Sequence, residues 1–582
     1  MERQYKTETL VGKDLDRIKI PKFQRGLVWS KSTKHEFIKT LHDGFPFGSL
    51  LVYPEKPHDP KSKLLLLDGQ QRLNTINELG KNPLDFWIPL NKEVLLSRLE
   101  AINSELKPVE KLSEKKLIEL LASDDISNAV PDWADDLDPS TDKKKIRKYI
   151  FALHEEIGKY IDLDSLQIPL IEFTGDKKYL PKVFENLNKG GVPLTKYEIF
   201  NASWASSEIN LPSSNVIADE ILDLTIEYYE QKIQDSAFDL DNFSRDEIKQ
   251  DRKLTLAELG IALGRFIEKN LPSIVPQGTK NTGSELGFGI LGIACNIDNK
   301  KLDELINKQE FINQNLPEIL DKVDSICFNL NETFSKLLTT PSSRSRYQTG
   351  LSTTFKTLSY FSALWNLKSG SCDYIKTMNN LPGYYLYDHF YGTWAAHGDT
   401  RLYDYYPEVN QKNYLTILDI DDFRNSFIQW LDEKNSGINF NADTTAITAI
   451  HANLTYLSNK LFDTDRLERE HVIAKKKINS IESGDRKIFG NSIGNCMYLV
   501  KSKNNSKKDK NLYEFLSEAE IKDSKIQYLI NESHYLTKEE FAKVDSHLAQ
   551  EEYDEINNII EFRARKIIDS ISKLLLPQSE LD

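Results

Sequence analysis

The stretch Lys63–Leu73 reads KLLLLDGQQRL and decides how the first part of the chain folds. Its run of leucines ends at an Asp-Gly turn, which is typical of a short buried strand. The following residues place Leu73, Ile76 and Leu79 on one face of a helix, and Gly80 is a common helix end. Polar side chains therefore stand at a predicted strand-to-helix junction, where backbone N–H groups favour anions.

Segments on both sides of this junction alternate between strand and helix patterns up to about Ser207. RIKIPKFQRGLVW, GSLLVYP and LQIPLIEF look extended, whereas KSTKHEFIKTLHDG has helical spacing. We predict an α+β multidomain fold with an α/β domain over residues 1–207. Residues 208–416 have a mostly helical pattern and form the predicted connecting domain. Residues 417–582 form a third, mostly helical domain with a strand-rich piece around His471–Lys501.

Composition limits the classes of protein to consider. The chain has 582 residues with 39% hydrophobic and 10% aromatic content, which is ample for several packed cores. We see no bilayer-spanning apolar run and no signal peptide in MERQYKTETL, so we expect no membrane partner. The four cysteines are far apart without a C-x-x-C pair, which fits a reducing cytoplasm. The net charge of −14 neither indicates nor excludes nucleic-acid binding.

Polar residues recur around the predicted strands of the first domain. Gln24 and Arg25 follow one strand, Ser49 stands at the entry to the next, Asp68, Gln71 and Arg72 follow a third, and Asn188 lies beside a Gly-Gly turn. Arginine offers forked donors suited to phosphate oxygens. Asp68 is suited to hold a Mg²⁺ that bridges phosphates, or to position a water molecule. A plainer reading stays open, in which Asp68 caps the helix and the arginines pair with surface carboxylates.

A second group of polar residues lies in the third domain. RLEREHVIAKKKI places Glu470 and His471 at the start of a β-prone segment, and a second strand-like segment follows Asn495. Two strands followed by a helix form the ββα arrangement of HNH nucleases, which hydrolyse phosphodiesters with a metal ion. His471 is the candidate general base and Asn495 would orient it. Glu470, with Asn504 or Asn505, would supply oxygen ligands for Mg²⁺ or Mn²⁺.

The basic run KSKNNSKKDK fits a DNA backbone beside this second site. Its candidate DNA-binding residues are Lys501, Lys507 and Lys508. A solvated lysine-rich turn is the alternative.

Two further stretches have less specific patterns. The turn-rich segment Leu381–Val409 interleaves tyrosine and tryptophan with His389, His397 and Arg401. Such aromatic clusters either stack on an extruded or modified base or pack between domains, and both readings stay open. GTKNTGSE from Gly278 has the glycine spacing of a phosphate-binding loop but lacks its lysine, so we predict an ordinary loop.

The order I-P-x-x-Q-R, G-S, D-G-Q-Q-R and F-x-x-x-N-x-G-G-x-x-L resembles the N-terminal domain of GmrSD-type proteins. The resemblance runs from Ile20 to about Ala202. These proteins are modification-dependent (type IV) restriction systems. The resemblance implies a ParB/sulfiredoxin-like domain that binds and hydrolyses nucleoside triphosphates and gates a nuclease. It would assign Gln24, Arg25, Asp68, Gln71 and Arg72 to the nucleotide pocket.

The C-terminal segment resembles the HNH domain that accompanies this N-terminal domain. The resemblance rests on EH, IGN and NS, and on a closing helix that carries Arg563. Two residues depart from the family pattern, with Ala474 in place of a frequent proline and Cys496 in place of leucine. The register favours Asn505 over Asn504 as the metal ligand.

Together the two resemblances imply a type IV endonuclease with NTPase activity. Its implied substrate is modified double-stranded phage DNA, for example with glucosylated or hydroxymethylated cytosine. Its implied cofactors are a divalent metal and a nucleoside triphosphate such as ATP or GTP, and a homodimer is compatible with it. Alternatives are a phosphorothioate-sensing nicking protein, a nucleotide-switched DNA-binding regulator with an inactive nuclease, and a toxin-like protein that acts on RNA.

Overall fold

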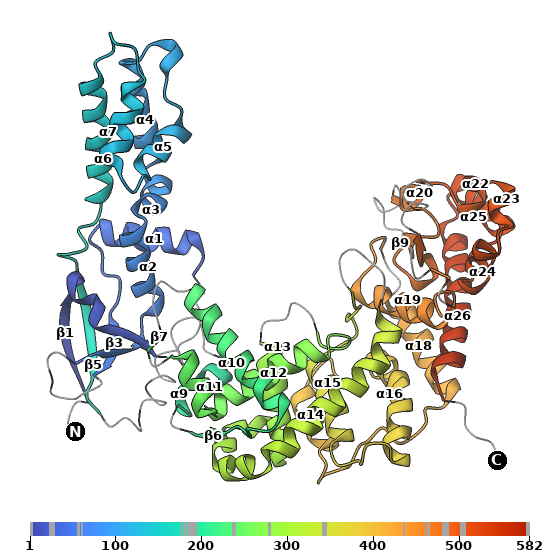
Figure 1. Cartoon of the computed structure of the whole chain (residues 1–582). Helices are drawn as coiled ribbons and strands as arrows, with labels where there is room; N and C mark the ends of the chain where they lie inside the picture. Colours follow the sequence, from blue (N-terminus) through green and yellow to red (C-terminus); the bar gives the residue numbers. More distant parts are fainter. Residues whose placement is uncertain are drawn as a thin grey trace. The chain divides into compact units, whose positions relative to one another are not determined.

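The computed structural model describes most of the chain. It covers residues 4–577 except 22–28, 55–58, 60–61, 176–178, 180–182, 184–194, 206, 236–239, 242, 277–280, 340–345, 435–436, 460, 463–465, 480–487, 501–503 and 505–507. Contacts divide the chain into two compact units (Figure 1): Met1–Ser206 with Ile226–Asp251, and Ser207–Thr225 with Arg252–Asp582. The predicted division into three domains stays a prediction. Within the described ranges, no helix has the length and apolarity needed to cross a membrane.

The first unit is built on a six-stranded mixed sheet with the order β1-β5-β3-β4-β2-β7. The strands are β1 (Tyr5–Val11), β2 (Ile18–Pro21), β3 (Leu50–Pro54), β4 (Leu64–Asp68), β5 (Gln167–Phe173) and β7 (Leu240–Asp241). Strand β4 runs antiparallel to β3 and parallel to β2. The run of four leucines is therefore a strand, as predicted, and Asp68 is its last residue.

Helices of the first unit form two groups. Helices α1 (Lys31–His42) and α2 (Gln70–Lys81) pack on the sheet, and Leu73, Ile76 and Leu79 belong to that shared core as predicted. The helices of the second group share a separate hydrophobic core and can be followed in Figure 1. They are α3 (Pro83–Leu90), α4 (Lys92–Ser104), α5 (Glu114–Leu121), α6 (Ile126–Asp135) and α7 (Lys143–Gly158). The remaining helices are α9 (Lys196–Ser203) and α11 (Arg245–Asp251), and α10 (Val216–Asp235) contains one border between the units.

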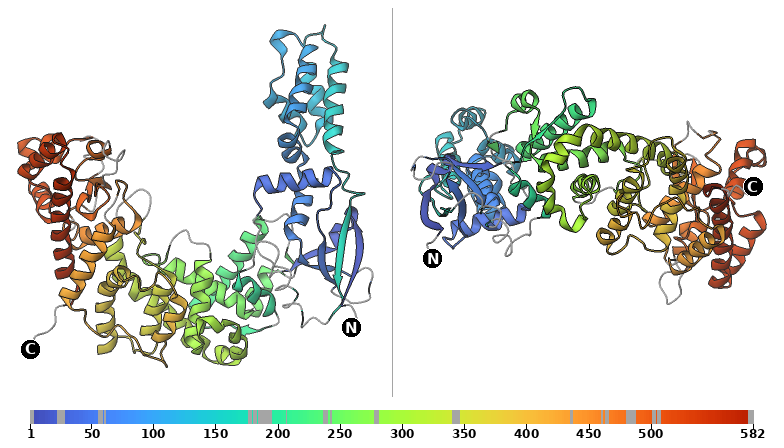
Figure 2. Two further views of the ribbon diagram at one scale, coloured as in Figure 1. Left: turned by 180° about the vertical axis from the view of Figure 1, so that it is seen from behind. Right: turned by 90° about the horizontal axis from the view of Figure 1, so that it is seen from below.

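The second unit is mostly helical, as Figure 2 shows from two further sides. Its helices are α12 (Leu256–Asn270), α13 (Thr282–Cys295), α14 (Gln309–Leu338), α15 (Thr354–Leu364), α16 (Cys372–Phe390), α17 (Gly398–Leu402), α18 (Ile420–Lys434), α19 (Ala442–Leu454), α20 (Lys475–Ile478), α22 (Leu512–Phe515), α23 (Glu518–Ile521), α24 (Ser524–Glu532), α25 (Lys538–Ala549) and α26 (Tyr553–Leu575). Its strands are β6 (Ile209–Asn210), β8 (Lys253–Leu254), β9 (Leu467–His471) and β10 (Cys496–Val500). Strands β9 and β10 pair antiparallel and share a core with the surrounding helices.

The prediction of a loop over the glycine-rich stretch from Gly278 is wrong in its second half. Helix α13 begins at Thr282, inside that stretch. A Cβ atom added to Gly264 of α12 would lie 1.7 Å from the carbonyl oxygen of Gly283 in α13. Gly264 and Gly283 therefore let the backbones of the two helices touch.

The turn-rich interruption predicted for Leu381–Val409 is wrong up to Phe390, because α16 continues to that residue. Pro382 lies inside the helix, and a Cβ atom added to Gly383 would lie 2.6 Å from Cδ2 of Leu576. Tertiary packing here overrides the low helix propensity of the Pro-Gly pair.

Candidate functional site

The predicted strand-to-helix junction exists between β4 and α2. Gly69 links them with a left-handed backbone (φ +99°), and a Cβ atom at this position would lie 2.4 Å from Cδ2 of Leu50. The N-cap residue Gly69 has no side chain that could cap the first turn of α2. The first turn of a helix favours an anion, because its N–H groups point outward along the helix dipole.

Arg72 and Asp68 are brought together at this junction. Nη2 of Arg72 donates to Oδ2 of Asp68 at 2.7 Å, and both side chains keep solvent access. A Cβ atom at Gly48, whose φ is +88°, would lie 2.4 Å from Nη1 of Arg72. The guanidinium thus lies directly against the segment that leads into β3, where Ser49 is half-buried. Three predicted residues, Ser49, Asp68 and Arg72, therefore gather around the start of α2.

The two glutamines that follow Gly69 have different environments. Oε1 of Gln71 accepts the backbone N–H of Trp29 at 3.1 Å, so this side chain holds the entry to α1. Gln70 is 8% exposed, and its Oε1 has no hydrogen-bond partner in the described part of the chain. An unpaired buried amide oxygen costs about 1–3 kcal/mol, which a bound donor would recover. Gln70 is therefore a candidate that the sequence reading leaves out, and its place beside Gly69 is the signal that could have found it.

The other predicted nucleotide-binding residues cannot be placed. Gln24, Arg25 and Asn188 lie outside the described residues.

Glu470 and His471 lie at the end of β9, whereas the sequence pattern places them at the start of a strand. His471 is paired with Cys496 and Glu470 with Met497 across the two strands. The apolar residues after His471 are buried in the turn that follows, so their hydrophobicity does not continue the strand. Asn504 has helical backbone conformation, whereas Asn505 lies outside the described residues.

His471 is held by a neighbouring loop. Its Nε2 lies 2.9 Å from the carbonyl oxygen of Ile438, and the ring of Phe440 stacks on the imidazole at 3.9 Å between centroids. A carbonyl oxygen only accepts hydrogen bonds, so Nε2 carries the proton in this pair. The lone pair of the neutral ring is then on Nδ1, which is the nitrogen able to take a proton.

Asn495 is completely buried and fixes the turn after His471. Its Oδ1 accepts the backbone N–H of Ile473 at 2.7 Å, and its Nδ2 donates to the carbonyl of Gly490 at 3.0 Å. Its own carbonyl accepts the N–H of Val472 at 2.9 Å. The described contacts of Asn495 thus reach the backbone beyond His471, while Ile438 and Phe440 orient the imidazole.

Arg563 of α26 supports the other side of the same turn. The guanidinium is 1% exposed and donates to five backbone carbonyls. The carbonyls of Gly494, just before β10, and of Cys496, the first residue of β10, lie at 2.8 and 3.1 Å, and that of Ser533 lies at 2.7 Å. Burial lowers the pKa of Arg563 to about 10. The sequence resemblance includes this residue, and in the structure its hydrogen bonds hold the backbone at the start of β10.

Lysines from two stretches meet beside β9. Lys508 is exposed, whereas Lys501 and Lys507 lie outside the described residues. Nζ of Lys476 lies 3.2 Å from Oδ2 of Asp509 and lowers the pKa of that carboxyl by hydrogen bonding. This pair brings the stretch with Lys508 next to the lysines that open α20, which the sequence reading does not select. Only the folded pairing of the two stretches reveals them.

Of the predicted metal ligands, Glu470 lies within the described residues and Asn505 does not. The described residues contain no group of three or more His, Cys, Asp or Glu side chains arranged to hold a metal ion. Glu470 offers the hard oxygen that Mg²⁺ prefers and precedes His471 directly in β9, where successive side chains point to opposite faces of the strand. The donor types fit a divalent cation, and the metal assignment stays a prediction.

Comparison with known proteins places the first of these sites in a family context. The model of the GmrSD restriction endonuclease N-terminal domain matches residues 7–205. This match covers about a third of the chain and supports a GmrSD-type N-terminal domain over these residues. An uncharacterized protein of Methanocaldococcus jannaschii is 22% identical over 235 residues, covering 32% of this chain and 38% of that protein. The chain therefore spans well under two thirds of this relative.

Proposed function

We propose that the chain is a nucleotide-dependent restriction endonuclease that cleaves modified double-stranded DNA in cytoplasmic defence. Its NTPase site would be the β4–α2 junction and its nuclease site the end of β9. The observation that carries this proposal is the family match over residues 7–205, because it contains the whole junction. The assignment of HNH chemistry rests on the arrangement of Glu470, His471 and Asn495 around the β9–β10 pair.

At the junction, the chain's own groups are suited to a triphosphate. The start of α2 favours an anion through the helix dipole, and Arg72 adds a charged fork at the same edge. Asp68 orients that fork and would position a bridging metal or the attacking water. The buried Oε1 of Gln70 would accept one further hydrogen bond from a donor of the nucleotide.

At the nuclease site, Nδ1 of His471 would take the proton from the attacking water while the carbonyl of Ile438 keeps Nε2 protonated. A divalent cation held by Glu470 and an asparagine would supply charge stabilisation to the scissile phosphate. The exposed Lys508 and the adjacent lysines of α20 would contact the DNA backbone.

The test is a cleavage assay with Mg²⁺ and each nucleoside triphosphate in turn. Its substrates are plain DNA, DNA with hydroxymethylated or glucosylated cytosine, phosphorothioate DNA, and RNA. We expect cutting of DNA with modified cytosine only, and only with a hydrolysable nucleotide. Nicking of phosphorothioate DNA alone would replace the substrate assigned here. Nucleotide hydrolysis without cutting of any substrate would instead favour a nucleotide-switched regulator.

A further inference from the structure

A cavity of about 440 Å³ lies within the second unit, and its lining contains no residue of β9 or β10. Its lining comes from the segment before α15, the end of α16, the end of α18 and the start of α19. A Cβ atom added to Gly350 would lie 2.4 Å from the carbonyl oxygen of Ala442, so the first of these segments packs closely on α19. The volume is that of a pocket for a small ligand.

Aromatic rings and carboxylates line this cavity together. Trp394 and Trp430 are each 5% exposed and present only part of their rings. His389 lies 5.9 Å from the ring of Trp430, and its Nε2 is 3.4 Å from Oδ2 of Asp443. Nε1 of Trp394 donates to Asp388 at 2.9 Å, and burial raises the pKa of that carboxyl. The cavity thus has apolar walls and hydrogen-bond acceptors at fixed positions.

A buried lysine completes the polar lining. Lys356 is 2% exposed, and its Nζ donates to the carbonyls of Leu351 at 2.7 Å and Tyr385 at 3.0 Å. An ammonium has three N–H donors, and the third has no hydrogen-bond partner in the described part of the chain. Burial lowers the pKa of Lys356 to about 8.

The charges exclude some classes of ligand. Three carboxylates, Asp388, Glu433 and Asp443, outnumber the two lysines of the lining, Lys356 and Lys434, which disfavours a phosphate. The lining also contains none of the His, Cys, Asp and Glu groupings suited to a metal ion in the described residues. A neutral ring that both donates and accepts hydrogen bonds, and that stacks on aromatic side chains, fits the lining.

We propose that this cavity binds a nucleobase that carries an exocyclic amino group, of the cytosine type, extruded from DNA. The carboxylate of Asp443 would accept from the amino group, and Lys356 would donate to the neighbouring ring acceptor. Thymine is disfavoured, because its carbonyl would face the carboxylate. The inference rests on the proposed function for the origin of the base, and it assigns base reading to the helical middle of the chain.

The cavity is linked mechanically to the nuclease strands through α19. Asp443 is followed directly by Thr444, whose Oγ1 donates to the carbonyl of Asn491 at 2.9 Å. The next residue, Thr445, accepts from Nη1 of Arg469 in β9 at 2.7 Å. A base held by Asp443 would therefore act on the helix that supports the nuclease site.

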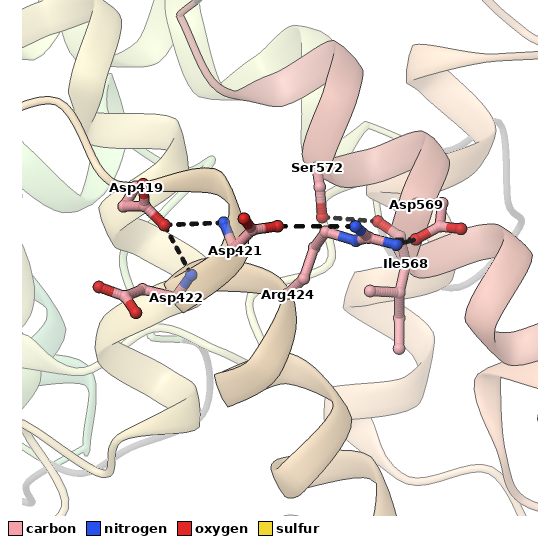
Figure 3. A network of polar contacts seen from close by, with 7 residues as sticks. All are labelled: Asp419, Asp421, Asp422, Arg424, Ile568, Asp569 and Ser572. Carbon is pink, nitrogen blue, oxygen red and sulfur yellow. Dashed lines mark hydrogen bonds and ion pairs between the residues drawn. The ribbon is translucent and has the colours of Figure 1, made fainter.

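A second link runs from α18 to α26. Figure 3 shows Arg424 of α18 reaching Asp569 of α26, with Nε donating to Oδ1 at 2.9 Å. The same helix α18 lines the cavity through Trp430 and Glu433, and α26 carries the Arg563 that holds the start of β10. The cavity and the nuclease turn thus share two supporting helices.

The test measures nucleoside binding to the full-length chain by ligand-observed NMR saturation transfer at millimolar concentration. The probes are 2′-deoxycytidine, its 5-hydroxymethyl derivative, thymidine, glucose and inorganic phosphate. We expect both cytosine nucleosides to bind and the other probes not to bind. Asp443→Asn should weaken that binding at least tenfold. Asp432→Asn removes an exposed carboxylate from α18 outside the cavity, and it should bind as the parent does.

Each alternative outcome is decisive. Absence of nucleoside binding, equal binding of thymidine, binding of glucose or phosphate in place of the cytosine nucleosides, or an unchanged affinity of Asp443→Asn would overturn the inference. Cleavage of DNA is measured on the same proteins. If the parent cuts DNA but does not discriminate between the nucleosides, only the base pocket is contradicted. If it binds the cytosine nucleosides specifically but does not cut DNA, the nuclease assignment is contradicted and the base pocket is kept.

Discussion

The β4–α2 junction and the β9–β10 pair hold their polar groups in different ways. At the junction, the residues that meet come from two short segments around Gly48 and Gly69, and Asp68 and Arg72 keep solvent access. At the β9–β10 pair, His471 is positioned by Ile438 and the strand start by Arg563, far away in the sequence. A local site needs a turn and a helix start, whereas a non-local site needs the whole unit folded around it.

The largest effect on stability is expected at Arg563. Arg563→Met would leave the carbonyls of Gly494, Cys496 and Ser533 buried without donors. An unpaired buried group costs about 1–3 kcal/mol, so the free energy of unfolding should fall by at least about 3 kcal/mol. Chemical denaturation measures it. Arg565→Met on the same helix removes a guanidinium 4.0 Å from Asp432 and should change stability by less than about 0.5 kcal/mol.

Equal stability of the two variants would show that the turn before β10 does not depend on Arg563. The contrast drawn here between a local and a non-local site would then be wrong.

The next effect concerns nucleotide binding at the junction. Arg72→Met removes a charged fork, and a charged hydrogen bond contributes about 1.5–3 kcal/mol. Nucleotide affinity should therefore fall about 10–100-fold, as measured by equilibrium titration. Arg98→Met of α4 removes an exposed pair with Glu156 and should leave affinity unchanged. An Arg72→Met protein that binds nucleotide like the parent would contradict the phosphate-binding role.

The smallest effect is a pH dependence of stability in the second unit. Burial, with Arg563 and His534 nearby, lowers the pKa of His451 well below 6.5. The unfolded chain then takes up a proton below about pH 6.5 that the folded chain does not. His451 should therefore lower the free energy of unfolding by up to about 1.4 kcal/mol per pH unit as the pH falls below 6.5, with full stability above it.

Denaturant unfolding between pH 5 and pH 7.5 measures this slope. In His451→Phe the slope should decrease, because the titrating group is removed. An identical slope in the parent and the variant would show that His451 is not the group that titrates.

Sequence reasoning succeeds where short-range patterns decide the structure. The leucine run, the Asp-Gly turn and the spacing of Leu73, Ile76 and Leu79 depend on neighbours in the chain, and β4 and α2 form there. The apolar residues after His471 also look like a strand, but they are buried in a turn that Asn495 holds. A hydrophobic pattern therefore indicates that residues are buried, but it does not indicate whether a strand or a turn buries them.

The residues missed by sequence reasoning share a long-range cause. The Oε1 of Gln70 lacks a hydrogen-bond partner among the described residues, and this is seen only once α2 is packed on the sheet. Ile438 contacts His471 only because a loop folds onto β9. The lysines of α20 join the basic run only through the pair of Lys476 with Asp509. The contacts of Ile438 and of the α20 lysines have no spacing or composition signal, whereas the place of Gln70 beside Gly69 marks it in the sequence.

The central claim is that one chain carries a nucleotide site at the β4–α2 junction and a separate nuclease site at His471. The most direct measurement follows nucleotide hydrolysis and cleavage of modified DNA in the same reaction for the parent and for His471→Ala. General-base catalysis contributes about 10²–10⁴-fold, so His471→Ala should lose cleavage by that factor and keep its hydrolysis. Cleavage at the parent's rate by His471→Ala would contradict the account.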